Sequence, residues 1–168
     1  MDFEPNEFKE FVQLGIDVTV DFYPSLIALG FTFKRLSFNN IPDDSCLNWQ
    51  GVIKRAKGAR DVAAYGVFHP ANVKAVYAFQ VAYKNEAVLL SHVERFENCP
   101  LEAKCLLGAN FALAVTKTTH SLIQNVSEAS ISIGVKDPLP ELHAMYLKFG
   151  QDAYFDADSN TIFYRGGL

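Results

Sequence analysis

Cysteine is scarce in this chain and lacks the spacing of a metal site or a disulfide framework. Three cysteines and four histidines occur among 168 residues. Cys99 and Cys105 enclose five residues, whereas the ligand pairs of a structural zinc site enclose roughly two to four. An odd number of cysteines also leaves one without a partner. The sequence therefore predicts neither a metal site nor a disulfide-stabilised scaffold.

Long apolar runs and an excess of basic residues are also missing. No apolar stretch is long enough to span a bilayer, and the segment Met1–Pro5 is acidic where a secretory signal is basic. We therefore expect a cytoplasmic protein with no membrane contact. The net charge of −4 gives no general attraction to phosphate backbones, which argues against a nucleic-acid partner. The basic run at 54–60 is typical of a solvated helix face.

Three common catalytic signatures do not occur: a Walker loop, a dinucleotide-binding glycine motif and a nucleophile elbow. What the sequence has in quantity is apolar. Hydrophobic residues make up 49%, with 14 Phe and 7 Tyr, enough for one full-sized core. We expect one domain over 1–168, in which 1–30 is a helical extension.

Hydrophobic periodicity predicts an α/β (α+β) fold: a mixed, mostly antiparallel sheet flanked by helices. The strand 73–83 alternates clearly and is joined to 87–96 by a turn at Lys84–Asn85, as in a β-hairpin. The segment 17–30 is ambiguous, because Val18–Val20 favours a strand while the spacing that ends at Gly30 favours a helix; we prefer the helix. The remaining predicted helices are 7–15, one from a cap at 43–45 to 57, 101–124 and 139–150, and the remaining predicted strands are 31–38, 62–68, 129–135, 153–155 and 161–164.

The helix near the end of the chain carries the most specific motif. Met145-Tyr-Leu-Lys-Phe-Gly150 resembles the "hydrophobic-Tyr-x-Lys-hydrophobic-Gly" signature of GNAT-type N-acetyltransferases. The predicted element order from about Phe31 to Arg165 is also that of the GNAT fold. This resemblance implies a GNAT-like domain with acetyl-CoA as co-substrate, in which Tyr146 protonates the leaving thiolate. From its own sequence context, Tyr146 is equally compatible with a core aromatic.

The resemblance also implies a pyrophosphate site at the turn before the long helix. The family pattern there is Arg or Gln, two residues, Gly, one residue, then Gly or Ala. The matching positions are Cys105, Gly108 and Asn110, with Ala109 between the last two and Lys104 available to supply the charge that Cys105 lacks. The alternative is that Gly108 is a close-packing residue inside an unbroken helix, with coenzyme binding lost or remodelled.

The strand before that helix is implied to run beside the pantetheine arm. Leu90, Ser91 and Val93 would offer backbone groups to its amides. His92 and Glu94 share a face by the period-two rule, and either one could take the proton of the attacking amine. The alternative for each is a solvent-facing residue at a strand end.

Two functions follow from these observations. The first is direct transfer of an acetyl group from acetyl-CoA to an amine on a small molecule or a protein. The second is a catalytically inactive GNAT-fold protein that binds a partner, as the replacement at Cys105 and the many Phe residues suggest, through a sheet edge or the N-terminal helices. A homodimer is compatible with both, and a pocket wide enough for a longer acyl chain is a third option.

Overall fold

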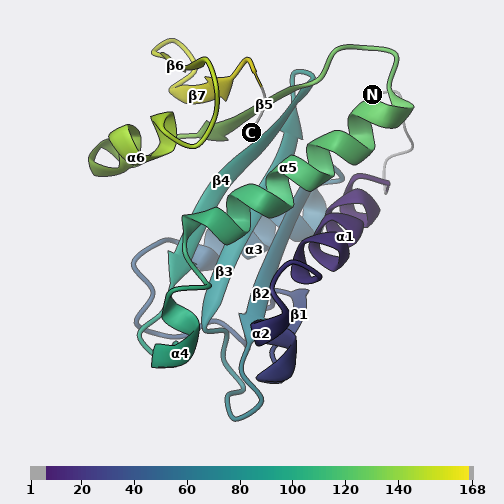
Figure 1. Ribbon diagram of the computed structural model, residues 1–168. Helices are drawn as coiled ribbons and strands as arrows, with labels where there is room; N and C mark the ends of the chain where they lie inside the picture. Colours follow the sequence, from purple (N-terminus) through teal and green to yellow (C-terminus); the bar gives the residue numbers. More distant parts are fainter. Residues whose placement is uncertain (1–6, 167–168) are drawn as a thin grey trace.

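The computed structural model describes residues 7–166, which form one seven-stranded sheet with helices on both faces (Figure 1). The strand order is β1-β2-β3-β4-β5-β7-β6, and every neighbouring pair is antiparallel except β4 and β5. The predicted mixed, mostly antiparallel sheet is confirmed. The strands are β1 (Thr32–Arg35), β2 (Val62–Phe68), β3 (Tyr77–Lys84), β4 (Ala87–Arg95), β5 (Ser132–Lys136), β6 (Ala153–Asp156) and β7 (Thr161–Tyr164). The helices are α1 (Glu7–Val20), α2 (Pro24–Ala28), α3 (Trp49–Gly58), α4 (Leu101–Lys104), α5 (Ala109–Val126), the 3₁₀ turn η1 (Pro140–Leu142) and α6 (His143–Leu147).

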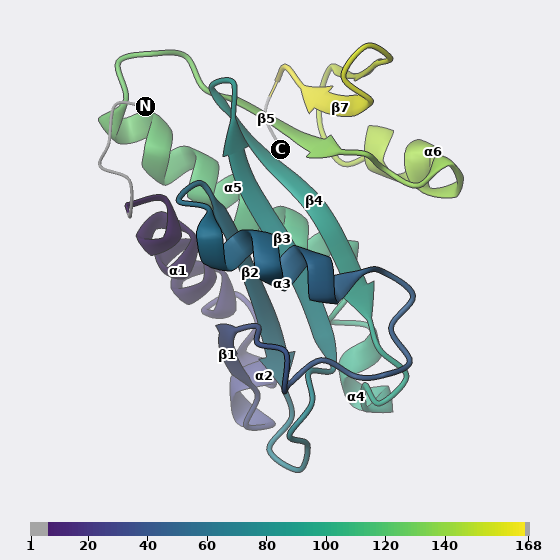
Figure 2. The same ribbon diagram turned by 180° about the vertical axis from the view of Figure 1, so that it is seen from behind.

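Each face of the sheet has its own hydrophobic cluster. Helices α1 and α5 cover one face, and α3 covers the other (Figures 1 and 2). On the first face the ring of Phe111 in α5 meets that of Phe79 in β3 edge-on, with 6.1 Å between centroids. On the second face, α3 buries Trp49, Val52 and Ile53. The sheet is thereby fixed between two layers, as an α/β domain of this length requires.

The N-terminal helical extension packs along α5. A Cβ built on Gly15 would lie 2.5 Å from Thr119 Oγ1, so the two helices approach closely there. Helix α1 runs five residues beyond its predicted end, and α2 follows after a turn at 21–23. The strand alternative for Val18–Val20 is wrong, and the preferred single helix is two helices that end before Gly30, whose φ is +81°. The part of the extension at 1–6 lies outside the described residues.

The predicted unbroken helix over 101–124 is also wrong. It is two helices, α4 and α5, separated by the loop 105–108. Gly108 has extended backbone angles (φ −108°, ψ −169°) and is the N-cap of α5. Two contacts hold this loop: the hydroxyl of Tyr77 donates to the Gly108 carbonyl at 2.7 Å, and Arg95 Nη1 donates to the Lys104 carbonyl at 2.6 Å. These contacts with residues distant in the sequence stabilise a break in the helix, although the local sequence favours a continuous helix.

Smaller corrections concern the ends of elements. Helix α3 is capped by Asn48, whose Oδ1 accepts the Gly51 N–H at 3.1 Å, and not by a residue at 43–45. The hairpin turn is Asn85–Glu86, one residue later than predicted, because both residues take the positive φ that a tight hairpin requires. Strand β3 begins at Tyr77 and not at 73, and the predicted helix over 139–150 is reduced to η1 and α6.

Candidate active site

The site begins where two parallel strands separate. Strands β4 and β5 pair from Ala87↔Ser132 to Leu90↔Val135, and β4 then continues to Arg95 with no further pairing to β5. At the same point β4 contains a bulge. Gln80 of β3 lies opposite His92, and Val81 lies opposite Leu90, so Ser91 has no partner across the ladder. A bulge bends its strand, and here it opens the edge of β4.

A cavity of about 140 Å³ lies at this opening. Its walls come from β4, from the segment after β5, and from η1 and α6; Leu47 closes one side. The structure brings five of the predicted site residues together here: Leu90, Ser91, His92, Val93 and Tyr146. Glu94 does not line the cavity, although it belongs to the same strand. We call this cavity the cleft.

Tyr146 contributes a phenol side chain to the wall of the cleft. Its side chain is buried on α6, and the hydroxyl of Tyr164 in β7 donates to its backbone carbonyl at 2.7 Å, which fixes α6 against the sheet. Burial raises the pKa of Tyr146 above its usual value. The phenol therefore stays protonated at neutral pH and is suited to donate a proton.

His92 lines the cleft from β4, and Tyr146, Lys136 and Asp137 are its other titratable groups. Its ring lies 6.0 Å from the Trp49 ring, centroid to centroid, and its Nδ1 is 3.2 Å from the hydroxyl of Ser91. Burial lowers the pKa of His92, the charge of Arg55 lowers it further, and Asp137 opposes the change. A histidine with a lowered pKa is neutral at pH 7, the form in which it can accept a proton.

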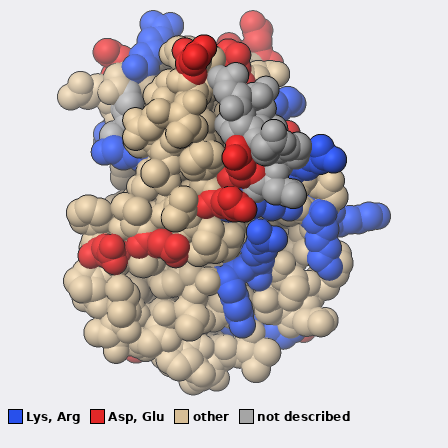
Figure 3. Space-filling view, turned by 90° about the vertical axis from the view of Figure 1, so that its right-hand side faces the viewer, with Lys and Arg blue, Asp and Glu red and all other residues tan. Residues whose placement is uncertain are grey.

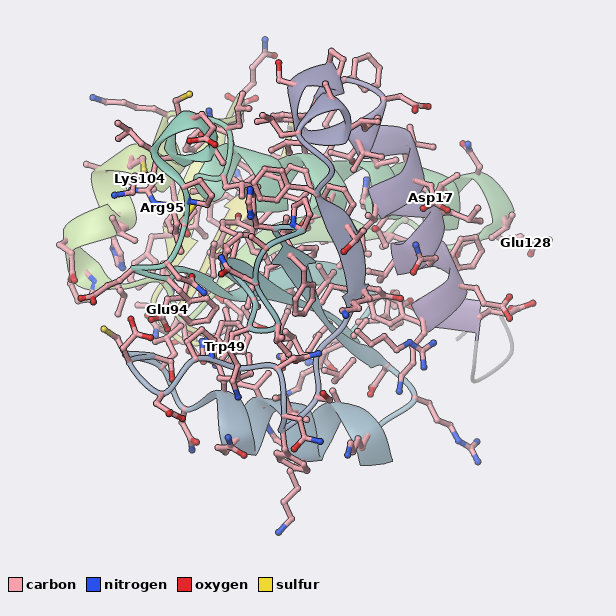
Figure 4. The ribbon with its side chains drawn as sticks, turned by 90° about the horizontal axis from the view of Figure 1, so that it is seen from below. Asp17, Trp49, Glu94, Arg95, Lys104 and Glu128 are labelled. Atoms are coloured by element: carbon pink, nitrogen blue, oxygen red, sulfur yellow. The ribbon has the colours of Figure 1, made fainter. Side chains whose placement is uncertain are left out.

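Glu94 is occupied by three hydrogen bonds. Its Oε2 accepts the Cys46 N–H at 2.8 Å, and its Oε1 accepts the Leu47 N–H at 3.1 Å and the Trp49 indole N–H at 2.9 Å. Figure 4 shows Glu94 and Trp49 together on the α3 side of the molecule. The reading of Glu94 as a solvent-facing strand end is therefore wrong. Glu94 holds the loop that carries Leu47 into the wall of the cleft.

The residues of the predicted pyrophosphate site lie at the start of α5. Gly108 caps this 18-residue helix, and no side chain caps its first turn. A Cβ built on Gly108 would meet nothing within 4 Å, so the alternative of a close-packing glycine inside a helix is wrong. Lys104, Cys105 and Asn110 are exposed, and Ala109 is half-buried. First-turn N–H groups have no partner within a helix and lie at its positive end, so this turn can receive an anion.

Arg95 is a residue that the sequence analysis missed. It ends β4 two residues beyond Val93, and its guanidinium binds the Lys104 carbonyl, which joins the strand of the cleft to the loop before α5. Figure 4 shows Arg95 and Lys104 side by side. This contact joins the end of a strand to residues just before a loop that the sequence analysis predicted as helix. The only signal in the sequence was a cation shortly before the expected phosphate turn.

The part of the chain that the structure describes offers neither a metal centre nor a membrane span. Among residues 7–166, no group of three or more His, Cys, Asp or Glu side chains is arranged to hold a metal ion. In the same range, no helix is both long and apolar enough to cross a membrane.

Comparison with known proteins was informative only at the level of structure. No protein-family model and no curated protein sequence matches the chain. Among solved structures, a KacTA–DNA complex matches with a TM-score of 0.51 and 16% identity, over 80% of this chain and 92% of that one. An AtaT–AtaR complex bound to DNA matches with a TM-score of 0.52 and 12% identity, over 79% of this chain and 93% of that one. AtaTR bound with acetyl-CoA matches with a TM-score of 0.51 and 12% identity, over 80% of this chain and 92% of that one. At these identities the matches show the fold alone, and that fold is GNAT-like, as the sequence resemblance implied.

Proposed function

We propose that the chain transfers an acetyl group from acetyl-CoA to an amine within one ternary complex. The observation that carries this proposal is the cleft at the β4–β5 divergence, which has a protonated phenol, Tyr146, and a neutral imidazole, His92, on its walls. AtaTR, which shares the fold at 12% identity, was solved with acetyl-CoA. The likeness supports the coenzyme and says nothing of the acceptor.

The proposed reaction needs one base and one acid. The amine nitrogen attacks the thioester carbonyl carbon, a C–N bond forms, and the C–S bond breaks with its electron pair going to sulfur. His92 takes the proton that the amine loses, and Tyr146 gives its proton to the thiolate. Water then returns the proton from His92 to Tyr146, so the products are the amide and the free thiol. Backbone N–H groups of β4 beside the cleft would polarise the carbonyl.

The proposed coenzyme path runs from the cleft residues of β4 to the predicted pyrophosphate turn at the start of α5. The pantetheine arm would begin at Leu90, the last residue of β4 that pairs with β5, and continue along Ser91 and Val93, which β5 leaves unpaired. The pyrophosphate would reach the first turn of α5, at Gly108, Ala109 and Asn110. The open space beside Gly108 is compatible with an anion there. Lys104 and Arg95 would supply the positive charge that Cys105 does not.

A single binding experiment tests this proposal. Acetyl-CoA at about a hundred times its dissociation constant should stabilise the native protein by roughly 2.7 kcal/mol, provided that it does not bind the unfolded chain. We therefore expect a clear rise in the unfolding temperature with acetyl-CoA and none with adenosine alone. An unchanged unfolding temperature at millimolar acetyl-CoA would contradict the proposed acetyltransferase activity and would leave the GNAT-like fold unaffected.

The first turn of α5 can be tested with one matched pair of substitutions. Asn110→Asp adds a negative charge at the positive end of the helix dipole, which stabilises a helix by about 0.3–1 kcal/mol. The same charge repels a pyrophosphate about 6 Å away, so we expect acetyl-CoA to bind roughly tenfold more weakly at low salt. Stability and affinity should thus change in opposite directions. Calorimetric titration and thermal unfolding measure the two.

The control is Asn125→Asp, the same change in the last turn of the same helix. Both asparagines are exposed, and both variants carry the same net charge. Asn125→Asp should lower the stability slightly, because the charge lies at the negative end of the dipole, and should leave acetyl-CoA affinity unaltered. Equal affinity loss in both variants would show that the coenzyme does not contact the first turn.

One observation favours the second candidate, a protein that binds a partner. Apolar side chains are exposed along the N-terminal helices and the residue after them, and Phe22 is 80% exposed. The lower part of this side of the molecule carries few charged side chains (Figure 3). A mutant AtaT toxin of similar fold (TM-score 0.50) was solved with the C-terminus of the antitoxin AtaR and acetyl-CoA. A partner and acetyl-CoA are therefore bound together in that protein. The acetyl-CoA experiment tests whether this chain is the catalytically inactive alternative, which should show no stabilisation by the coenzyme. The exposed residues are Leu14, Val18, Phe22, Ile27 and Leu29.

A further inference from the structure

A short chain of polar side chains leads from the sheet into the cleft. Gln80 of β3 is 6% exposed and lies among apolar neighbours, a position that is costly for an amide without hydrogen bonds. Its Nε2 donates to Ser91 Oγ at 2.6 Å, and that oxygen is 3.2 Å from His92 Nδ1. Ser91 is the bulge residue of β4, so the bulge brings its hydroxyl between the buried amide and the imidazole.

Counting protons limits the possible directions of these hydrogen bonds. A serine hydroxyl has one proton and two lone pairs. The Ser91 hydroxyl donates to the backbone carbonyl of Gln80 at 3.4 Å and accepts from the Gln80 amide. Ser91 Oγ can then offer His92 Nδ1 a lone pair, with the histidine proton on Nδ1. It can also turn its own proton from the carbonyl at 3.4 Å to Nδ1 at 3.2 Å, with the histidine proton on Nε2.

The opposite orientation of the Gln80 amide leaves only the first of these two arrangements. Gln80 Oε1 is buried and has no hydrogen-bond partner among the described residues. If the amide is turned over, this oxygen accepts the Ser91 proton, and Ser91 again has only lone pairs for the imidazole. The 2.6 Å separation of the two side-chain atoms is typical of an O–H···O bond and short for an N–H···O bond, which favours this orientation. In it the neutral His92 is protonated on Nδ1 and has its lone pair on Nε2.

We propose that Ser91 and Gln80 are positioning residues that hold His92 in its Nδ1–H tautomer and so present the Nε2 lone pair to the acceptor amine. This role in catalysis rests on the proposed acyl transfer. The ring of His92 lines the cleft, and Nε2 has no hydrogen-bond partner among residues 7–166, which leaves this nitrogen for a ligand. The amine proton passes to Nε2, while Nδ1–H continues to donate to Ser91. The imidazolium therefore needs no rearrangement of the network.

The charged groups around His92 come from three elements. Arg55 of α3 disfavours the imidazolium, and Asp137, which follows β5, favours it. Glu94 lies on the same strand, but its carboxylate is turned to the loop before α3. Lys136 and Asp137 both line the cleft, and Lys136 Nζ pairs with Asp137 Oδ1 at 3.5 Å. None of these groups contacts Nδ1, so Ser91 alone selects the tautomer.

The test is the ¹⁵N spectrum of the imidazole rings in the full chain, recorded without coenzyme or acceptor. The other three histidines provide internal references for the Nε2–H tautomer. His120 Nε2 lies 2.7 Å from the Ile131 carbonyl, and His143 Nε2 lies 3.3 Å from the Pro138 carbonyl. A carbonyl only accepts, so both rings are protonated on Nε2. His69 accepts the Ala71 N–H at its Nδ1, which again leaves the proton on Nε2.

We expect one ring of the four, that of His92, to be protonated on Nδ1 at neutral pH. His92→Gln removes that signal and assigns it. Ser91→Ala should convert the ring to the Nε2–H form or to a mixture, and Ser91→Thr, which keeps a hydroxyl, should restore Nδ1–H. A wild-type ring protonated on Nε2, or a Ser91→Ala ring that keeps its proton on Nδ1, overturns the inference. Because no substrate is present, the result is independent of the acetyl-CoA experiment.

Discussion

We expect the replacement of Tyr146 with phenylalanine to lower the rate of the proposed acetyl transfer by about a hundredfold or more and to leave the protein folded. A positioned acid contributes roughly 10²–10⁴ to a rate, and phenylalanine removes the proton while it keeps the ring. Among residues 7–166 the hydroxyl of Tyr146 has no hydrogen-bond partner, since the contact with Tyr164 uses the backbone carbonyl. Its loss should therefore change the unfolding free energy by less than about 1 kcal/mol. Steady-state kinetics and thermal unfolding measure the two effects.

The matched control for this substitution is Tyr154→Phe. Tyr154 is a half-buried phenol on β6 that stacks on Phe163 and Arg165 and is not part of the cleft. Its activity should equal that of the wild type. Acetyl-CoA should bind Tyr146→Phe about as tightly as the wild type, because the lost proton acts in the reaction and not in binding. A fully active Tyr146→Phe would exclude the phenol as the acid.

The sequence predicted the order of elements because hydrophobic period is a local property. Strand β2 was predicted with its observed ends, and His92 and Glu94 were placed on one face. The break at 105–108 could not be found in this way. Cys-Leu-Leu-Gly is compatible with a helix, and the groups that hold the break open, Tyr77 and Arg95, come from strands 31 and 9 residues away along the chain.

Long-range contacts also explain what was missed at the site. The bulge at Ser91 depends on the register of two strands, and no local pattern shows it. The alternating pattern of the strand gave Gln80 no role, because its role depends on the contact between its amide and the Ser91 hydroxyl. The three donors to Glu94 lie 45 to 48 residues earlier in the sequence. The family resemblance supplied the candidate residues of the proposed site, but it did not predict the contacts that orient them.

The replacement at Cys105 follows the same logic. The family motif has Arg or Gln at this position, and its absence suggested a lost coenzyme site. The structure instead places Arg95 against the Lys104 carbonyl, so two cations from different elements stand beside the loop. A phosphate-binding charge does not need to come from one sequence position, because only its place in space affects the ligand. In the proposed coenzyme path, Arg95 and Lys104 would supply the positive charge that Cys105 lacks.

Replacing Glu94 with alanine should destabilise the protein by about 3 kcal/mol. The substitution removes the acceptor of three N–H groups, and the Trp49 indole among them belongs to a side chain that is 1% exposed. A buried donor left without a partner costs roughly 1–3 kcal/mol, and the two backbone donors, nearer to water, add smaller amounts. In a domain of this size the unfolding temperature should fall by roughly 6–12 °C.

The control for stability is Glu97→Ala, which removes an exposed carboxylate just after β4 and should change the unfolding temperature very little. Glu94→Gln then separates the two roles that were open for this residue. Its amide oxygen can still accept from Leu47 and Trp49, so the fold and the cleft wall should largely persist. If Glu94 holds the loop and His92 is the base, Glu94→Gln retains most of the activity, and the loss in Glu94→Ala follows the lost stability. A folded Glu94→Gln variant that is a hundredfold slower, with normal acetyl-CoA affinity, would make Glu94 the base and remove that role from His92.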